Sequence, residues 1–276
     1  MKIARTVLEL NTLLNQLNLN SSIGFVPTMG ALHQGHISLI NESKKQCQFT
    51  VCSIFVNPTQ FNDKKDLERY PRNEEKDLIL LNEAKCDLVF LPSVNEMYPE
   101  PDNRVFDFGT LDKVLDGDAR PGHFNGVAQI VSKLFNSVKP TKAFFGLKDY
   151  QQVLIIKNLV KQLNLNVEII ACPILREKDG LAMSSRNSLL TTSERKLASL
   201  IPQLMSSIPS LKKAGYSFNR ILLHFENKFS TQDYKLDYLK LANAQTLQIE
   251  DEFNDEHQQI VLIACFVGKI RLIDNI

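Results

Sequence analysis

The chain has 276 residues, of which 43% are hydrophobic and 23% are charged, and its formal net charge is +1. This length and composition predict a globular protein with one large and one smaller domain. The near-zero net charge argues against a nucleic-acid-binding protein, and no apolar run approaches the length of a membrane-spanning helix. The five cysteines follow no paired spacing, so we expect free thiols and a cytoplasmic protein. Apolar residues at helical spacing in residues 1–16 predict a helix and not a signal peptide.

The first part of the chain alternates between apolar runs, rich in strand-forming residues, and amphipathic stretches. This alternation predicts an α/β fold, namely a Rossmann-like, doubly wound and mostly parallel sheet, which binds ligands at the carboxyl ends of its strands. Residues 57–72 and 92–103 are predicted as loops, and residues 105–108 as a short extended segment. The predicted strands are residues 23–26, 49–56, 87–91, 142–145 and 167–171, and the predicted helices begin near residues 36, 74, 127 and 147.

The pattern changes from residue 188 onward. Two helix-like stretches, residues 193–205 and 218–229, precede three strand-like runs at residues 236–242, 259–266 and 269–273. We therefore expect a Rossmann-like domain over residues 1–187 and a small α+β domain over residues 188–276.

The stretch Pro-Thr-Met-Gly-Ala-Leu-His-Gln-Gly-His, residues 27–36, carries the clearest chemical signal. It places His33 and His36 between the end of a predicted strand and the start of a predicted helix. A helix start favours phosphate, and neutral imidazoles can donate hydrogen bonds to phosphate oxygens. Gly30 and Gly35 can adopt positive φ and let a ligand approach the backbone. The alternatives are a tight turn with two surface histidines and, less well supported, a metal site.

A second polar stretch, residues 176–187, contains Met183, Ser184, Ser185 and Arg186. Two hydroxyl groups beside a guanidinium suit a phosphate group. The alternative is a plain linker between the two predicted domains.

Taken together, these two stretches resemble the HIGH and KMSKS signatures of the class I aminoacyl-tRNA synthetase and nucleotidylyltransferase superfamily. The chain is most similar to the pantothenate synthetase (pantoate–β-alanine ligase) family, and the resemblance runs essentially from end to end. The motifs that carry it lie at residues 27–36, 55–61, 70–72, 120–127, 144–152, 176–187 and 267–275.

The resemblance implies a ligase that condenses pantoate with β-alanine, using ATP and Mg²⁺. Such an enzyme first forms a pantoyl adenylate and releases pyrophosphate, and the amine of β-alanine then displaces AMP. The resemblance also implies a homodimer, and neither nucleic-acid nor membrane partners are expected.

Transferred to this sequence, the family's site residues fall into four groups. The expected catalytic residues are His33, His36, Lys148 and Arg186. The expected ATP-binding residues are Met29, His33, His36, Gly146, Lys148, Asp149, Leu175, Met183, Ser184, Ser185 and Arg186. The expected pantoate-binding residues are Met29, Asn57, Gln60 and Gln152, and the expected magnesium ligand is Asp77.

Several points stay open at this level. Tyr70 either contacts a ligand or shapes its loop, and Arg120 and His123 either contact the adenylate or brace its surroundings. No general base is identified, although His33 is a candidate. The run Asn62-Asp63-Lys64-Lys65-Asp66 and Leu147 depart from the family pattern. The competing functions are a nucleotidylyltransferase that lacks the pantoate pocket and a nucleotide-binding protein without catalytic activity; a tRNA synthetase is disfavoured because no basic tRNA-binding domain is present.

Overall fold

The computed structural model describes residues 1–18, 21–229 and 233–276. The chain divides into two compact units: unit 1 comprises Met1–Leu147 and Gln151–Pro173, and unit 2 comprises Lys148–Tyr150 and Ile174–Ile276. Within the described ranges, no helix is both long enough and apolar enough to cross a membrane. All five cysteines are free; four of them are buried, and Cys47 is half-buried.

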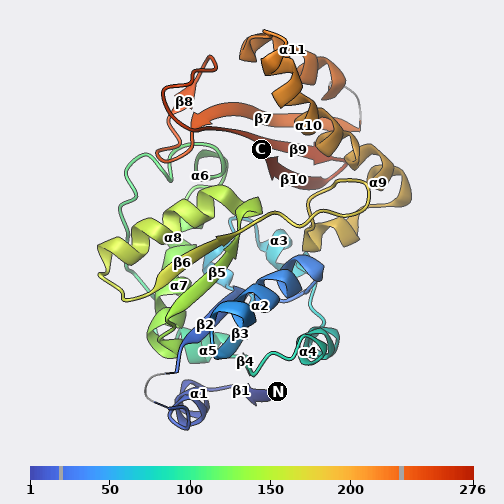
Figure 1. Cartoon of the computed structure of the whole chain (residues 1–276). Coiled ribbons are helices and arrows are strands. Elements are labelled where there is room, and N and C mark those ends of the chain that lie inside the picture. Colours follow the sequence, from blue (N-terminus) through green and yellow to red (C-terminus); the bar gives the residue numbers. More distant parts are fainter. Residues whose placement is uncertain (19–20, 230–232) are drawn as a thin grey trace. The chain divides into compact units, whose positions relative to one another are not determined.

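Unit 1 is built on a six-stranded sheet in which every neighbouring pair of strands is parallel (Figure 1). The strand order is β1-β4-β3-β2-β5-β6. The strands are β1 (Lys2–Ala4), β2 (Ile23–Thr28), β3 (Phe49–Ile54), β4 (Leu88–Phe90), β5 (Lys142–Gly146) and β6 (Glu168–Cys172). The predicted Rossmann-like α/β fold is therefore confirmed.

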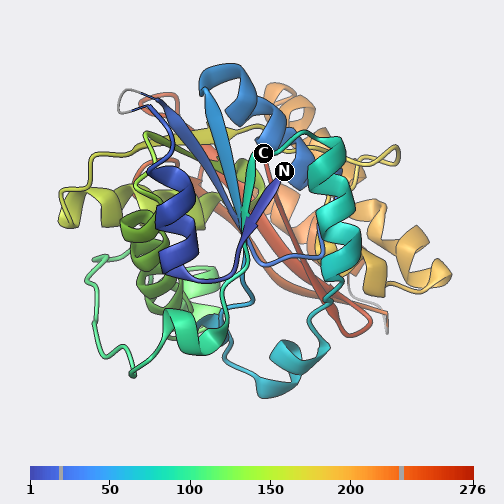
Figure 2. The ribbon, with the colours of Figure 1, turned by 90° about the horizontal axis from the view of Figure 1, so that it is seen from below.

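Helices cover both faces of this sheet, as Figures 1 and 2 show. Successive strand residues point to opposite faces, so Phe25 packs with α1, α7 and α8, whereas its neighbour Val26 packs with α2 and α4. The helices of unit 1 are α1 (Val7–Leu14), α2 (Gln34–Gln46), α3 (Lys64–Arg69), α4 (Glu74–Glu83), α5 (Val94–Met97), α6 (Asp116–Ala119), α7 (His123–Val138) and α8 (Tyr150–Gln162), whose first residue falls in unit 2. Short 3₁₀ helices are η1 (Pro58–Gln60), η2 (Leu147–Asp149) and, in unit 2, η3 (Ser185–Leu189).

The sheet order places a switch point beside β2. The chain continues from β2 to β3 on one side, whereas β5, the later strand, pairs with β2 on the other side. In open parallel sheets, ligands bind outside the carboxyl ends of the strands at such a point. The loops that follow β2 and β5 are therefore the first place in unit 1 to look for a site.

Unit 2 contains an antiparallel sheet of four strands in the order β10-β9-β7-β8. Its apolar core lies between this sheet and three helices. The strands are β7 (Tyr234–Asn243), β8 (Ile249–Glu250), β9 (Gln259–Val267) and β10 (Ile270–Asn275), and the helices are α9 (Thr192–Ala198), α10 (Leu200–Lys213) and α11 (Phe218–Phe229). A smaller α+β part was predicted at this end of the chain.

The division between the units differs from the boundary predicted after residue 187. Residues 174–187 belong with unit 2 because their side chains bind there. Arg176 forms a bidentate ion pair with Asp274, at 2.6 and 2.9 Å, and Arg195 binds both Glu177 and Asp179. Residues 174–187 are thus anchored to unit 2 by ion pairs and are not a plain linker.

Several local predictions were wrong. The N-terminal region begins with strand β1, which pairs with β4, before helix α1 starts. The predicted charged loop contains helix α3, whose start is capped by Asp63, and the predicted proline-rich loop contains α5, capped by Ser93. Residues 105–108 pair with no strand; instead, the backbone N–H of Phe106 donates to Asn125.

The helix predicted at residues 193–205 is two helices, α9 and α10, that meet at Ser199. Pro202 lies in the first turn of α10 and has no backbone N–H to donate to the preceding turn. A continuous helix would therefore lose a hydrogen bond at this position.

Candidate active site

Two histidines begin helix α2, just beyond the carboxyl end of β2. His33 is the N-cap residue: its Nδ1 accepts a hydrogen bond from the backbone N–H of Gly35 (3.1 Å), and His36 Nδ1 accepts one from the backbone N–H of His33 (3.3 Å). A neutral imidazole that accepts at Nδ1 carries its proton on Nε2. Both rings, whose centroids lie 4.1 Å apart, thus present an N–H donor at the positive end of a helix.

The turn between β2 and α2 is held by a buried carboxylate from α4. Asp77 Oδ2 accepts a hydrogen bond from the backbone N–H of Ala31 (2.9 Å), and Oδ1 accepts one from Leu32 (2.7 Å). Burial raises the pKa of Asp77, and the two backbone hydrogen bonds oppose that rise. Gly30 has a φ of +77°, and a Cβ there would lie 2.9 Å from Asp77 Oδ2, so glycine is required. Gly35, by contrast, has no positive φ, contrary to expectation.

This geometry shows a structural role for Asp77, and the magnesium role predicted for it stays a prediction. The residue is 1% exposed, and each of its carboxylate oxygens already accepts a backbone hydrogen bond. Among the described residues, no group of three histidine, cysteine or acidic side chains is arranged to hold a metal ion. Asp77 therefore serves the conformation of the histidine-bearing turn.

Three of the residues predicted to bind pantoate lie together beyond the ends of β2 and β3. Gln60 Nε2 lies 2.9 Å from the sulfur of Met29, and Asn57 Nδ2 donates to Gln60 Oε1 at 3.2 Å. Asn57 and Gln60 are buried, and Met29 is half-buried. The structure thus brings these three residues together in unit 1, and their contact with pantoate stays a prediction.

The two glutamines at the start of α8 have different surroundings. Gln151 is buried; its amide donates to the carbonyl oxygens of Leu111 (2.7 Å) and Val114 (2.8 Å) and accepts from the backbone N–H of Asp116. Gln152 is half-buried, and its side chain makes no hydrogen bond within the described part of the chain. Gln151 is therefore structural, and Gln152 is the one of the pair that can serve a ligand.

Arg120 and His123, whose roles the sequence left open, brace this cluster. His123 Nδ1 lies 2.8 Å from the carbonyl oxygen of Gln60, and Arg120 contacts both that oxygen (3.5 Å) and His123 Nε2 (3.3 Å). Tyr70 is buried and packs edge-on against Phe61. These contacts favour the bracing interpretation for Arg120 and His123 and the packing interpretation for Tyr70.

Lys148 and Asp149 follow β5 in the sequence and belong to unit 2. Lys148 Nζ lies 3.5 Å from Asp149 Oδ1, and the side chain of Asn275 donates to the carbonyl oxygen of Lys148 at 3.1 Å. In unit 1, the preceding Gly146 faces open space, where a Cβ would meet no atom within 4 Å. The short η2 helix thus places a cation and a carboxylate directly after an accessible glycine.

The serine-rich stretch of unit 2 has a defined conformation. Met183 donates its backbone N–H to the carbonyl oxygen of Leu175 (3.0 Å), which brings these two residues side by side. Ser184 caps η3 by accepting a hydrogen bond from the backbone N–H of Arg186 (3.3 Å). Asn187 donates to Glu177 Oε1 at 2.7 Å and so ties the two ends of the stretch together. Ser184, Ser185 and Arg186 are therefore carried on a braced loop.

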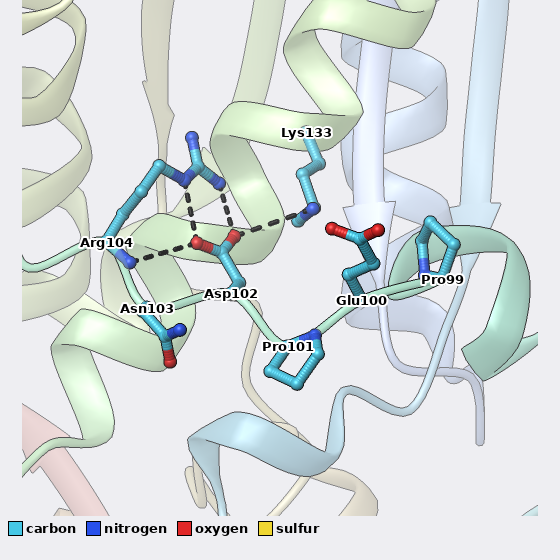
Figure 3. A pocket seen from close by; sticks show the side chains of 7 residues that line it. All are labelled: Pro99, Glu100, Pro101, Asp102, Asn103, Arg104 and Lys133. Carbon is cyan, nitrogen blue, oxygen red and sulfur yellow. Dashed lines mark hydrogen bonds and ion pairs between the residues drawn. The ribbon is translucent and has the colours of Figure 1, made fainter.

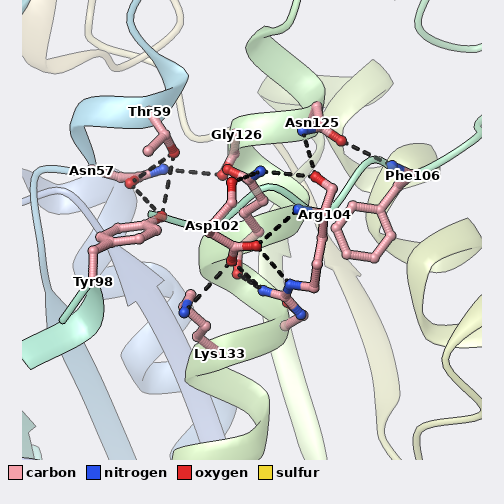
Figure 4. A network of polar contacts seen from close by, with 11 residues as sticks. Asn57, Thr59, Tyr98, Asp102, Arg104, Phe106, Asn125, Gly126 and Lys133 are labelled. Atoms are coloured by element: carbon pink, nitrogen blue, oxygen red, sulfur yellow. Dashed lines mark hydrogen bonds and ion pairs between the residues drawn. The ribbon is translucent and has the colours of Figure 1, made fainter. Parts of the chain in front are cut away.

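Sequence reasoning missed a polar network on one face of α7. Asp102 accepts hydrogen bonds from Arg104 Nη2 (2.6 Å) and Nε (2.8 Å) and forms an ion pair with Lys133 (3.5 Å), as Figure 3 shows. These three side chains line a surface hollow of about 550 Å³. The Arg104 guanidinium lowers the pKa of Asp102 to about 2. Tyr98 links this region to Asn57 (Figure 4). Residues 98–106 contain Pro99 and Pro101 and show no periodicity, so their sequence carried little signal.

The fold and the helix-start histidines define an α/β nucleotide-binding protein of the His-x-Gly-His type. A sequence model of the pantoate-beta-alanine ligase family matches residues 2–276. A pantothenate synthetase of Porphyromonas gingivalis is 49% identical over 255 residues, which cover 92% of this chain and 91% of that protein. One from Bacteroides fragilis is 46% identical over 278 residues and covers 100% of this chain and 98% of that protein.

Solved structures agree with this assignment. The crystal structure of pantothenate synthetase from Thermus thermophilus superposes with a TM-score of 0.92 at 39% identity, covering 100% of this chain and 99% of that one. The pantoate-beta-alanine ligase of Francisella tularensis, complexed with beta-gamma ATP and beta-alanine, has a TM-score of 0.85 at 35% identity, with coverages of 100% and 97%. The chain belongs to the pantoate–β-alanine ligase family, and joining pantoate to β-alanine is its activity. The family predicted from the sequence motifs is thus confirmed.

Proposed function

We propose that this ligase works through a pantoyl adenylate formed from ATP. In the first half-reaction, a carboxylate oxygen of pantoate bonds to the α-phosphorus of ATP, and the bond from that phosphorus to the pyrophosphate oxygen breaks. In the second, the amine nitrogen of β-alanine bonds to the acyl carbon, the bond from that carbon to the AMP oxygen breaks, and the nitrogen loses a proton. The ATP and β-alanine bound to the Francisella tularensis relative support these substrates.

The paired Nε2–H donors of His33 and His36 carry this proposal. Their Nδ1 atoms are fixed by backbone N–H groups, so the donors are preorganised at the start of α2. Donors held in place before reaction stabilise negative charge that develops as pyrophosphate leaves. The rest of the catalysis is positioning of the carboxylate against the α-phosphorus, and no side chain has to act as a covalent nucleophile.

In unit 2, we assign nucleotide contacts to both braced segments. Lys148 and Arg186 supply cationic donors for phosphate oxygens, and the hydroxyls of Ser184 and Ser185 add neutral ones. Asp149 accepts hydrogen bonds from the ribose hydroxyls. In unit 2, we assign contacts with the nucleoside to the paired backbones of Leu175 and Met183. In unit 1, we assign such contacts to Gly146 and Met29.

For pantoate, we assign direct contacts to Met29, Gln60 and Gln152, with Asn57 holding Gln60. Amide groups can satisfy both the hydroxyls and the carboxylate of pantoate. This set separates the ligase from a nucleotidylyltransferase, which has no need for it.

Three further assignments complete the proposal. ATP enters with Mg²⁺ held mainly by its own phosphate oxygens, since this ion binds substrate phosphates and retains several waters. The free thiols support a cytoplasmic location. The family resemblance supports a homodimer.

Pyrophosphate release from ATP and Mg²⁺ tests the proposal, measured with and without pantoate and then after addition of β-alanine. We expect release to require pantoate, to stop near one equivalent per site, and to turn over when β-alanine is added. Release that ignores pantoate but responds to a phosphorylated acceptor would instead support a nucleotidylyltransferase. ATP binding without any release would support a protein that lacks catalytic activity.

A further inference from the structure

The amide of Asn57 is saturated with hydrogen bonds (Figure 4). Its Nδ2 donates to the carbonyl oxygen of Gly126 (3.0 Å) and to Gln60 Oε1 (3.2 Å), and its Oδ1 accepts from Tyr98 Oη (2.8 Å) and Thr59 Oγ1 (3.2 Å). A primary amide has two hydrogens and two acceptor positions, so both hydrogens are in use and both acceptor positions face a hydroxyl group. Asn57 is also only 1% exposed. It therefore serves the site through its neighbours and not by binding a substrate itself.

The direction of this network is fixed by Gly126. A backbone carbonyl can only accept, so the NH₂ group of Asn57 must face it, and the oxygen must face Tyr98 and Thr59. The Tyr98 hydroxyl, at 2.8 Å, must then donate to that oxygen. Thr59 Oγ1 lies 3.2 Å from the same oxygen and 3.3 Å from Tyr98 Oη, so its one hydrogen serves either of the two. A Cβ at position 126 would lie 2.4 Å from the carbonyl oxygen of Thr59, so only glycine allows α7 to approach the η1 turn this closely.

The same direction determines which end of Gln60 is presented. Because Asn57 donates to Gln60 Oε1, the NH₂ group of Gln60 lies on the other side, 2.9 Å from the sulfur of Met29. His123 holds the carbonyl oxygen of the same residue at 2.8 Å, so both the backbone and the side chain of Gln60 are fixed. An NH₂ donor suits a carboxylate or hydroxyl oxygen of the substrate. If the Gln60 amide were turned around, its oxygen would face the substrate oxygen, and the two would repel each other.

We propose that Tyr98 is a positioning residue for pantoate: its hydroxyl holds the Asn57 amide, which in turn fixes the donor end of Gln60. Thr59 places a second hydroxyl group beside the same oxygen. This inference rests on the proposed function, because it requires Gln60 to bind pantoate. The ring of Tyr98 packs against Phe55 (centroids 6.3 Å apart) and lies under Lys133 Nζ (5.1 Å), so its packing does not depend on the hydroxyl.

The test is pantoate binding by calorimetry, together with steady-state kinetics, for the wild type and Tyr98→Phe. Loss of one hydrogen bond in the network should raise the Kd and KM for pantoate about three- to tenfold. The KM for ATP and the cooperative unfolding transition should remain as in the wild type. Adding Thr59→Val to Tyr98→Phe should raise the pantoate Kd further. Tyr216→Phe is the matched control, because the Tyr216 ring packs on Arg220 in unit 2 and has no assigned role in the site.

A double-mutant cycle separates positioning from a general structural effect. In a Gln60→Leu background, Tyr98→Phe should have no further effect on pantoate binding, because the group that it positions is gone. An equal effect of Tyr98→Phe in both backgrounds, or an unchanged pantoate Kd in Tyr98→Phe, would overturn the inference while leaving the ligase function intact. A wild-type protein that binds no pantoate would instead overturn the proposed function, and this inference with it.

Discussion

The imidazole of His36 accepts a hydrogen bond from the backbone N–H of His33, and His33 caps the same helix through its own Nδ1. In the usual capping box a hydroxyl and a carboxylate fill these two positions, and neither group has an N–H donor of the imidazole kind. Here each side chain uses one nitrogen to stabilise the helix start and presents the other as a donor. The local structure and the proposed chemistry therefore depend on the same two residues.

Replacing His33 or His36 by alanine should lower the rate of pyrophosphate release about a hundredfold or more, because each change removes a preorganised donor. His33→Ala should also lower the free energy of unfolding by about 1 kcal/mol, since the N-cap is lost. Pyrophosphate release and thermal unfolding measure the two effects. His224→Ala, at an exposed position of α11, is the control. Near-normal release by both active-site variants would contradict the phosphate assignment.

The change Asp77→Asn distinguishes a brace from a magnesium ligand. The new amide would keep one acceptor oxygen, but its NH₂ group would face a backbone N–H of the turn, and two donors cannot form a hydrogen bond. The free energy of unfolding should therefore fall by about 1–3 kcal/mol. Activity should fall at every Mg²⁺ concentration, and the concentration that gives half-maximal activity should not change. Magnesium titrations of the variant and of Glu75→Gln, an exposed neighbour on α4, measure this. A marked rise in the Mg²⁺ requirement of Asp77→Asn alone would show that its carboxylate binds the ion.

The class of fold could be predicted from the sequence because buried parallel strands are continuous apolar runs, as in β2 and β3. Short elements could not be predicted in this way, as β1 and α3 illustrate. Strand β1 has three residues, Lys2–Ala4, and lies directly before a helical repeat. Helix α3 has no buried residue and hence no apolar repeat; its start depends on the cap formed by Asp63.

The site was predictable where chemistry and position coincide, as for His33 and His36 at the start of α2. It was not predictable where a partner is a backbone group. Asp77 binds two backbone N–H groups, which every residue except proline possesses, so the sequence gives no sign of that role. The bond between Tyr98 and Asn57 joins residues that are 41 positions apart. It exists because the end of α5 lies beside the η1 turn, which no local pattern reveals.

The ion pair of Arg176 with Asp274 should be essential for the serine-bearing loop of unit 2. Asp274 is 2% exposed, so Arg176→Met would leave a buried carboxylate without its partner and should lower the free energy of unfolding by about 3–5 kcal/mol. The double change Arg176→Met with Asp274→Leu should cost less than the sum of the two single changes. Denaturant titration measures these differences.

A contrasting pair provides the control for that experiment. Lys212 binds Asp255, whose side chain is 96% exposed, so Lys212→Met should cost at most about 1 kcal/mol. Equal costs for Arg176→Met and Lys212→Met would mean that the loop is not anchored by its ion pair.

The ion pair of Asp102 with Arg104 should make the stability of the protein depend on pH. The pKa of Asp102 is lowered to about 2, first by the hydrogen bond from Arg104, whereas an unfolded aspartate has a pKa of about 3.9. A lowered pKa means that the ionised carboxylate stabilises the folded state above about pH 4, and that this contribution is lost as the pH falls toward about 2. Since Arg104 is 42% exposed, we expect a contribution of roughly 1–2 kcal/mol.

Asp102→Asn should therefore be less stable than the wild type at about pH 7, and the difference should shrink between about pH 4 and pH 2. Denaturant titrations across this range, with Asp251→Asn at an exposed position as the control, measure the difference. A difference that stays constant with pH would show that Asp102 acts through shape and not through its charge.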